Sequence, residues 1–150
     1  MKTRNLLLLA VGCGLAILLA GGVKLFQIGS SDSPPPPLEL GLPGTIGDMT
    51  VTPLHAELVG DTLSVAVELQ GVDDPDGATS FWLAAAGSRL DPVPGAPDAC
   101  SSTSAAEPTR CTLTFDVTDV GGQRVLIYER TVSEREDRLR WYVRLHETEG

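Results

Sequence analysis

The sequence predicts an all-β domain, an antiparallel β-sandwich of about seven short strands, preceded by one N-terminal transmembrane helix. Three observations support this fold class. An uncharged apolar run fills residues 6–23, and residues 38–150 alternate apolar and polar side chains with the period of a strand. Clusters of Gly, Asp and Pro separate the alternating runs, as turns do between antiparallel strands.

The apolar run is long enough to cross a membrane. Residues 6–23 carry no charge, and Lys24, as a snorkelling residue with two more apolar residues behind it, extends the span to residues 6–26. At 1.5 Å per residue such a helix covers about 30 Å, the thickness of the hydrocarbon core. Lys2 and Arg4 precede the span and only Lys24 follows it, so the charge bias favours a cytoplasmic N-terminus.

Two other interpretations of this segment stay open. A cleaved signal peptide would end at a site such as Ala20-Gly21-Gly22, but its apolar core normally has about 7–15 residues. A lipoprotein signal would use Cys13, yet the apolar run continues another ten residues beyond that cysteine. We therefore expect an uncleaved signal anchor in the cell membrane.

The composition changes abruptly after the apolar run. The formal charge is +3 in residues 1–26, -1 in 27–37 and -11 in 38–150, which together give the net -9 of the chain. Four prolines end the second stretch and favour a short, stiff polyproline spacer. The acidic remainder argues against nucleic-acid binding. The predicted order is a cytoplasmic N-terminus (1–5), a transmembrane anchor (6–26), a Ser/Pro-rich linker (27–37) and an extracytoplasmic domain (38–150).

Three runs in the acidic part alternate cleanly between a buried and a solvated face. Their apolar positions are Leu63, Val65, Val67 and Leu69, then Leu113, Phe115 and Val117, then Leu139, Trp141, Val143 and Leu145. Further strands are expected at 49–58, 81–85 and 124–132, with Pro53 bending the first. Turns are expected at 59–61, 73–77 and 120–122, and a long loop at 92–108. About seven strands in 113 residues match an immunoglobulin-like sandwich.

The order of these patterns resembles a known group of domains. An opening strand is introduced by Gly47, and the alternating strand 63–69, the Phe81-Trp82-Leu83 strand and the Leu-x-Phe-x-Val strand 113–117 follow. This layout resembles the secreted or membrane-anchored immunoglobulin-like domains of unknown function of Gram-positive, actinobacterial bacteria, related to the mycobacterial immunoprotective extracellular antigen. The resemblance covers about residues 40–146. It implies an extracytoplasmic sandwich and supplies no catalytic residues.

Two cysteines lie outside the apolar run. Cys100 and Cys111 close a loop of about 12 residues, and an even pair in an extracellular domain is expected to form a disulfide. A redox-active dithiol normally has closer spacing, with two residues between the cysteines. We therefore predict a structural disulfide that ties the long loop to the strand that follows it.

Four side chains of the last expected strand suggest a binding strip. Arg138, Arg140, Tyr142 and Arg144 fall on one face of that strand. Guanidinium groups in a row suit phosphate, uronate or carboxylate groups of an anionic wall polymer. The alternative is that acids on neighbouring strands pair with these arginines, because residues 38–150 contain 19 acids. Both interpretations stay open.

Patterns for metal binding are weaker. The turn at 73–77 carries three aspartates ahead of a glycine, Asp73, Asp74 and Asp76, but the spacing of an EF-hand is not met. The two histidines are His55 and His146, and nothing in their spacing suggests a zinc site. We expect an acidic turn, no metal and no cofactor.

The sequence contains no nucleophile elbow and no phosphate-binding glycine loop, so we expect no enzymatic activity. Trp141 is expected in the core, and Trp82 either in the core or exposed as a binding residue. After residue 37 the chain contains Arg but no Lys, which fits a GC-rich bacterial genome. The expected function is a membrane-anchored binding or accessory module of a bacterial envelope, with an envelope protein or an anionic wall polymer as partner. The alternatives are a passive structural subunit of an envelope complex and a domain secreted after signal cleavage.

Overall fold

The structure is a computed structural model that describes residues 3–30, 34–76 and 79–145. The chain divides into two compact units, Met1–Pro35 and Pro36–Gly150. Each unit is described by itself.

The N-terminal unit is one helix, α1 (Thr3–Ser30). Its stretch Thr3–Lys24 is long and apolar enough to cross a membrane, a property that membrane anchors share with signal sequences. The helix continues four residues beyond Phe26, where we expected the linker to begin. The reason is local, because the first proline, which would end a helix, comes only at Pro34.

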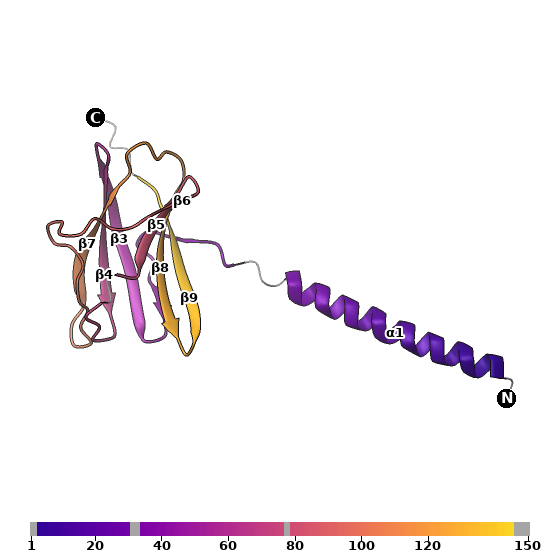
Figure 1. The fold of residues 1–150 in the computed structure, drawn as a ribbon. Coiled ribbons are helices and arrows are strands. Elements are labelled where there is room, and N and C mark those ends of the chain that lie inside the picture. The colour runs from indigo at the N-terminus through magenta and orange to yellow at the C-terminus, as the bar shows by residue number, and fades with distance from the viewer. Residues whose placement is uncertain (1–2, 31–33, 77–78, 146–150) are drawn as a thin grey trace. The chain divides into compact units, whose positions relative to one another are not determined.

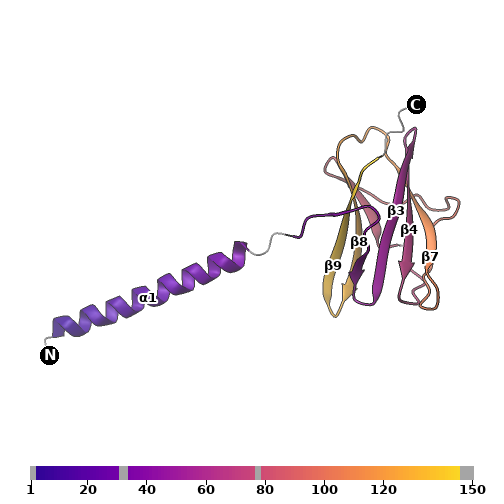
Figure 2. The same ribbon diagram turned by 180° about the vertical axis from the view of Figure 1, so that it is seen from behind.

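The second unit consists of two β-sheets (Figures 1 and 2). The five-stranded sheet has the order β1-β9-β8-β5-β6 and the four-stranded sheet the order β2-β3-β4-β7. All neighbours are antiparallel except β1 and β9. The strands are β1 (Leu38–Glu39), β2 (Gly44–Ile46), β3 (Met49–Val59), β4 (Thr62–Gln70), β5 (Phe81–Ala85), β6 (Ser88–Leu90), β7 (Thr109–Asp116), β8 (Arg124–Val132) and β9 (Arg135–Val143).

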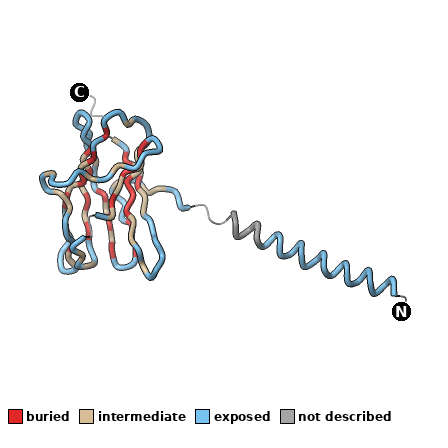
Figure 3. Tube along the Cα trace, in the orientation of Figure 1, coloured by how far each residue is buried: buried red, intermediate tan, exposed pale blue. Residues whose placement is uncertain are grey.

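The inner faces of the two sheets form a single core (Figure 3). The three alternating runs all turn their apolar positions inward, as predicted, and Val117 is buried just beyond the end of β7. Trp141 is fully buried, and its indole Nε1 donates a hydrogen bond to the carbonyl oxygen of Leu42 at 2.9 Å. Every member of the core and of the apolar shell around it lies between Leu38 and Leu145, so this unit has a complete core of its own.

The described residues contain nine strands instead of the expected seven or so. The additional strands are short: β1 and β2 come from the segment before the first expected strand, and β6 pairs with β5 through a tight turn. The turn between β8 and β9 places both Ser133 and Glu134 at positive φ, a conformation that normally selects Asn or Gly. Sequence patterns therefore gave no signal for this hairpin. Pro53 marks a real irregularity, because the β3–β4 register shifts between Pro53 and His55.

Candidate functional site

The long loop before β7 is fixed to that strand by the predicted disulfide. Cys100 and Cys111 are bonded, with their Cα atoms 4.8 Å apart. We call residues 91–100 the strap. The amide of Val93 donates to the carbonyl oxygen of Thr114 at 2.7 Å, and the amide of Thr112 donates to that of Asp98 at 2.8 Å. The strap thus covers the outer edge of β7.

A cavity of about 380 Å³ lies between the strap and β7. Its walls include Pro92, Val93, Pro94, Thr112 and Thr114. The titratable side chain in its lining is Asp91, because Cys100 is held in the disulfide. The other polar side chains of this lining are the hydroxyls of Thr79, Thr112 and Thr114.

The second candidate is the solvent side of the five-stranded sheet. Arg138, Arg140 and Tyr142 of β9 stand opposite Glu129, Ile127 and Val125 of β8, and Ile127 is also opposite Trp82 of β5. These residues alternate with core residues and therefore point away from the core. We call the following set the outer face: Trp82, Ala84, Arg89, Val125, Ile127, Glu129, Arg138, Arg140, Tyr142 and Arg144.

The centre of the outer face is apolar. Ile127 is only 6% exposed although it points away from the core, because side chains of the neighbouring strands cover it. Trp82 is half-buried on this face, and its Nε1 lies 3.4 Å from Oε2 of Glu129 as donor to that carboxylate. The sequence left open whether Trp82 lies in the core or on the surface. The structure places it on the surface, half-buried.

The predicted arginine row is present on this face, and its ends have acidic partners. Nε of Arg138 lies 2.8 Å from Oε2 of Glu129, and Nη2 of Arg138 lies 3.6 Å from Oε2 of Glu136. Nη2 of Arg144 lies 3.1 Å from Oε1 of Glu39 on the other flank. Arg140 is half-buried between them. An anion that binds here has to displace these carboxylates.

Two guanidinium groups also lie over aromatic rings. The Cζ atom of Arg89 is 4.8 Å from the centroid of Trp82, and Nε of the same arginine is 3.2 Å from Asp91. The Cζ atom of Arg144 is 6.0 Å from the centroid of Tyr142. Such contacts fix the orientation of side chains that are otherwise flexible.

The charges of the outer face and its rim balance. Four arginines, Arg89, Arg138, Arg140 and Arg144, are matched by the four carboxylates of Glu39, Asp91, Glu129 and Glu136. Residues 38–150 as a whole carry a charge of -11. The acidic excess therefore lies elsewhere on the domain, and this face is a neutral, aromatic region within it.

Glu129 and Glu136 share a hydrogen bond that moves their pKa values in opposite directions. That bond lowers the pKa of Glu129, with a further contribution from the Arg138 charge, while burial works against the shift. The pKa of Glu136 is raised, because the hydrogen bond to Glu129 retains its proton and the charge of Glu129 disfavours its ionisation.

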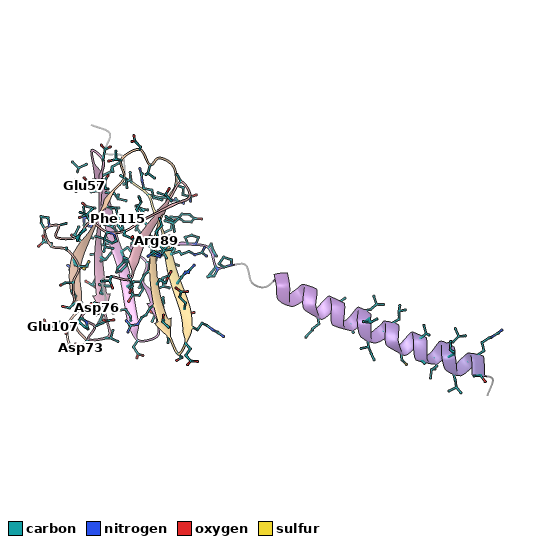
Figure 4. All side chains as sticks on the ribbon, in the orientation of Figure 1. Glu57, Asp73, Asp76, Arg89, Glu107 and Phe115 are labelled. Atoms are coloured by element: carbon teal, nitrogen blue, oxygen red, sulfur yellow. A yellow bond between two sulfur atoms is a disulfide. The ribbon has the colours of Figure 1, made fainter. Side chains whose placement is uncertain are left out.

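The acidic turn has a structural role. Asp74 Oδ1 accepts the amide of Asp76 at 3.0 Å, and Asp73 Oδ1 accepts the amide of Ala105 at 2.9 Å. These bonds hold the turn against a loop distant in sequence. Figure 4 shows Asp73 and Asp76 beside Glu107 at one end of the domain, opposite the end that carries Glu57.

Among the described residues, no group of three or more His, Cys, Asp or Glu side chains is placed to hold a metal ion. His55 lies exposed on β3, whereas His146 and Gly77, which the sequence also singled out, lie outside the described residues. Comparisons of the chain with protein-family models, curated proteins and solved structures found no match.

Sequence reasoning identified one strand of the outer face and missed the rest of it. Arg89 lies on β6, a strand of three residues that no pattern predicted. Ile127 and Glu129 lie on a predicted strand, but only the β8–β9 register shows that they face the arginine row. The missing information was therefore which strands are neighbours.

Proposed function

We propose that the chain is a single-pass, membrane-tethered binding module on the outer side of a bacterial cell envelope, without catalytic activity. Helix α1 supports a tether, and the cations Lys2 and Arg4, ahead of its apolar run, favour a cytoplasmic N-terminus. The Cys100–Cys111 disulfide supports an oxidising compartment for the second unit, because such bonds persist outside the cytoplasm.

We also propose that the second unit is an immunoglobulin-like sandwich. Without the short β1 and β2, the sheets run β3-β4-β7 and β9-β8-β5-β6. Immunoglobulin-type sandwiches place strands A, B and E in one sheet, and G, F and C in the other, with C′ beside C in variable-type domains. The strands from β3 to β9 take these positions in sequence order. In variable domains the G, F, C, C′ sheet corresponds to the sheet that carries the outer face here.

The observation that carries the proposal is the make-up of the outer face. Trp82 and Arg140 lie opposite a buried isoleucine on its two neighbouring strands, and Tyr142 is the next outward-facing residue of β9 after Arg140. Arg89, Arg138 and Arg144, with acidic partners, lie around them. Trp, Tyr and Arg are the residues that dominate binding energy at protein–protein interfaces. A face whose charges are already paired can also be covered without burying an unpaired charge. A protein partner therefore fits this face better than a polyanion, which would need a net positive surface.

The test is crosslinking of the full-length chain in native membranes, followed by affinity capture. We expect a defined envelope protein to be captured, and Trp82→Ala and Tyr142→Ala each to reduce its recovery at least tenfold. The matched control is Arg110→Gln, which removes a comparable exposed ion pair, Arg110–Glu68 at 2.7 Å, from the other sheet. Capture that is unchanged in the Trp82 and Tyr142 variants would reject the outer face as the docking surface.

The same experiment separates the two alternative functions. If the partner is an anionic wall polymer, Arg140→Gln with Arg144→Gln will weaken retention of the chain on that polymer, and no protein will be captured. If the chain is a passive structural subunit held by its helix, partners will crosslink to residues of α1 only. Either result would contradict the proposal.

A further inference from the structure

The edges of the two sheets are protected unequally. The strap covers the edge of β7, and β6 is an edge of only three residues. The lower half of β3, residues 49–53, is covered: residues 49–51 pair with β2, and the amide of Gly41 donates to the carbonyl oxygen of Pro53. β1 covers part of β9, and the remaining edge of β9 is highly charged. Cover, shortness and charge are the usual ways in which proteins prevent strands from adding to a sheet edge.

The upper half of β3, residues 55–59, has no such cover, and Glu57 is its one acidic side chain. Within the described part of the chain, β4 is the only strand that pairs with it. β3 and β4 form a hairpin with a two-residue turn, so Val59 and Thr62 are its closing hydrogen-bonded pair. Because hydrogen-bonded and non-hydrogen-bonded pairs alternate, the N–H and C=O groups of Ala56 and Leu58 point away from β4.

This half-strand and Leu54, the residue before it, carry exposed apolar side chains. Five large apolar residues are exposed in the described part of the second unit, and three of them are Leu54, Leu58 and Val59 on β3. Val59 is 67% exposed and the two leucines 37% each. In Figure 4 the label of Glu57 marks this end of the domain. An edge with outward backbone groups and apolar side chains is a template for strand addition.

We propose that residues 55–57 of β3 pair in antiparallel orientation with residues 57–55 of a second copy of the chain, around a two-fold axis at Ala56. This register makes Ala56 of the two copies a hydrogen-bonded pair, because its backbone groups face outward. It places His55 opposite Glu57 of the second copy, twice by symmetry. An imidazole N–H is a donor for a carboxylate, so the two side chains are complementary.

The charge pattern selects this register over its neighbour. An axis at Glu57 would also satisfy the outward backbone groups, but it would place the two Glu57 carboxylates directly opposite each other. The charge of -11 on each copy opposes association, so pairing should strengthen when salt screens that repulsion. The pairing uses the edge of the four-stranded sheet and does not depend on the outer face.

The first test is disulfide trapping with the full-length chain in membranes, in a Cys13→Ala background that removes the free cysteine. Chains with His55→Cys and chains with Glu57→Cys are expressed together under different tags and oxidised. We expect at least tenfold more bonding between the two variants than between two Glu57→Cys chains. Equal disulfide yields for the mixed pair and for two Glu57→Cys chains would overturn the proposal. So would an equal yield when Glu136→Cys on β9 replaces either variant of the mixed pair.

The second test is independent of oxidation. Sedimentation of the full-length chain in detergent micelles should show a dimer that Glu57→Lys weakens at least tenfold. The double variant His55→Glu with Glu57→Lys should restore it, because opposite charges face each other again. Glu134→Lys, the same change of charge in the β8–β9 turn, is the control and should leave the dimer intact. A monomer at all concentrations and salt levels, or no rescue by the double variant, would contradict the pairing.

Discussion

Removal of the Cys100–Cys111 disulfide is the perturbation whose effect can be worked out most fully. The bond closes a loop between residues 11 positions apart and fixes the strap against β7. In the chain-entropy model, cross-linking a loop of this size removes about 3 kcal/mol of entropy from the unfolded chain. The variant Cys100→Ala with Cys111→Ala should therefore lower the free energy of unfolding by about 3 kcal/mol.

The structure also predicts where the variant will loosen. Besides the disulfide, the strap is held to β7 by the two backbone hydrogen bonds of Val93 and Thr112, each worth about 1 kcal/mol. Those bonds alone cannot balance the ordering of ten residues, which costs about 1–2 kcal/mol each. Amide exchange at Val93 and Thr112 should accelerate in the variant, while amides in β8 stay protected.

The assays are urea unfolding, which gives the free energy, and thermal unfolding, which gives the melting temperature, of residues 36–150, the unit with a complete core, with and without a reducing agent. The oxidised wild type should melt about 10–20 °C above the double variant, and reduction should bring the wild type down to the variant's value. The reducing agent should not affect the variant. A double variant within about 1 kcal/mol of the oxidised wild type would refute the reasoning, because the disulfide would then not restrain the unfolded chain as assumed.

Three further predictions concern stability and are checked by the same unfolding assay. Gly71→Ala should lower the free energy of unfolding by about 3 kcal/mol or more, because Gly71 has φ +128° and a Cβ there would fall on the carbonyl oxygen of Asp48. Gly95→Ala, with open space around the new Cβ, should lower it by only about 1 kcal/mol. Equal losses for the two variants would contradict this reasoning. Trp141→Phe should cost about 2–4 kcal/mol through the lost volume and the lost bond to Leu42, and a neutral result would be incompatible with full burial. The Glu136→Gln variant should become more stable relative to the wild type as the pH rises through the acidic range. The reason is that the pKa of Glu136 is raised in the folded state, so its ionisation favours unfolding of the wild type. A stability difference between the two proteins that does not change with pH would disprove the raised pKa.

The strands could be predicted from the sequence where alternation and burial agree. The run from Leu63 to Leu69 is regular because β4 lies in the middle of its sheet, with one face on the core and one on solvent. The helix was equally predictable, since residues 6–23 form one long apolar run without a charge. The cysteine pair could be predicted because only two cysteines lie outside the apolar run.

The outer face could not be predicted in the same way. Its parts come from β5, β6, β8 and β9, which are brought together by sheet order, and no local pattern encodes that order. The sequence placed Arg138 and Arg144 on one face but could not identify Glu129 and Glu39 as their partners. The turn of the β8–β9 hairpin could not be predicted for a related reason. The strands on both sides impose a positive φ on Ser133 and Glu134, which these residues do not favour locally.

The central claim is that the outer face docks a protein, and one measurement tests it most directly. A photoreactive residue is placed at Ala84, which is half-buried on the outer face, or at Ala66, which is half-buried on the solvent side of the other sheet. The full-length chain is then irradiated in native membranes. A discrete protein adduct that forms from position 84 and not from position 66 is the predicted result. Adducts of equal yield from both positions, or none from position 84, would contradict the account.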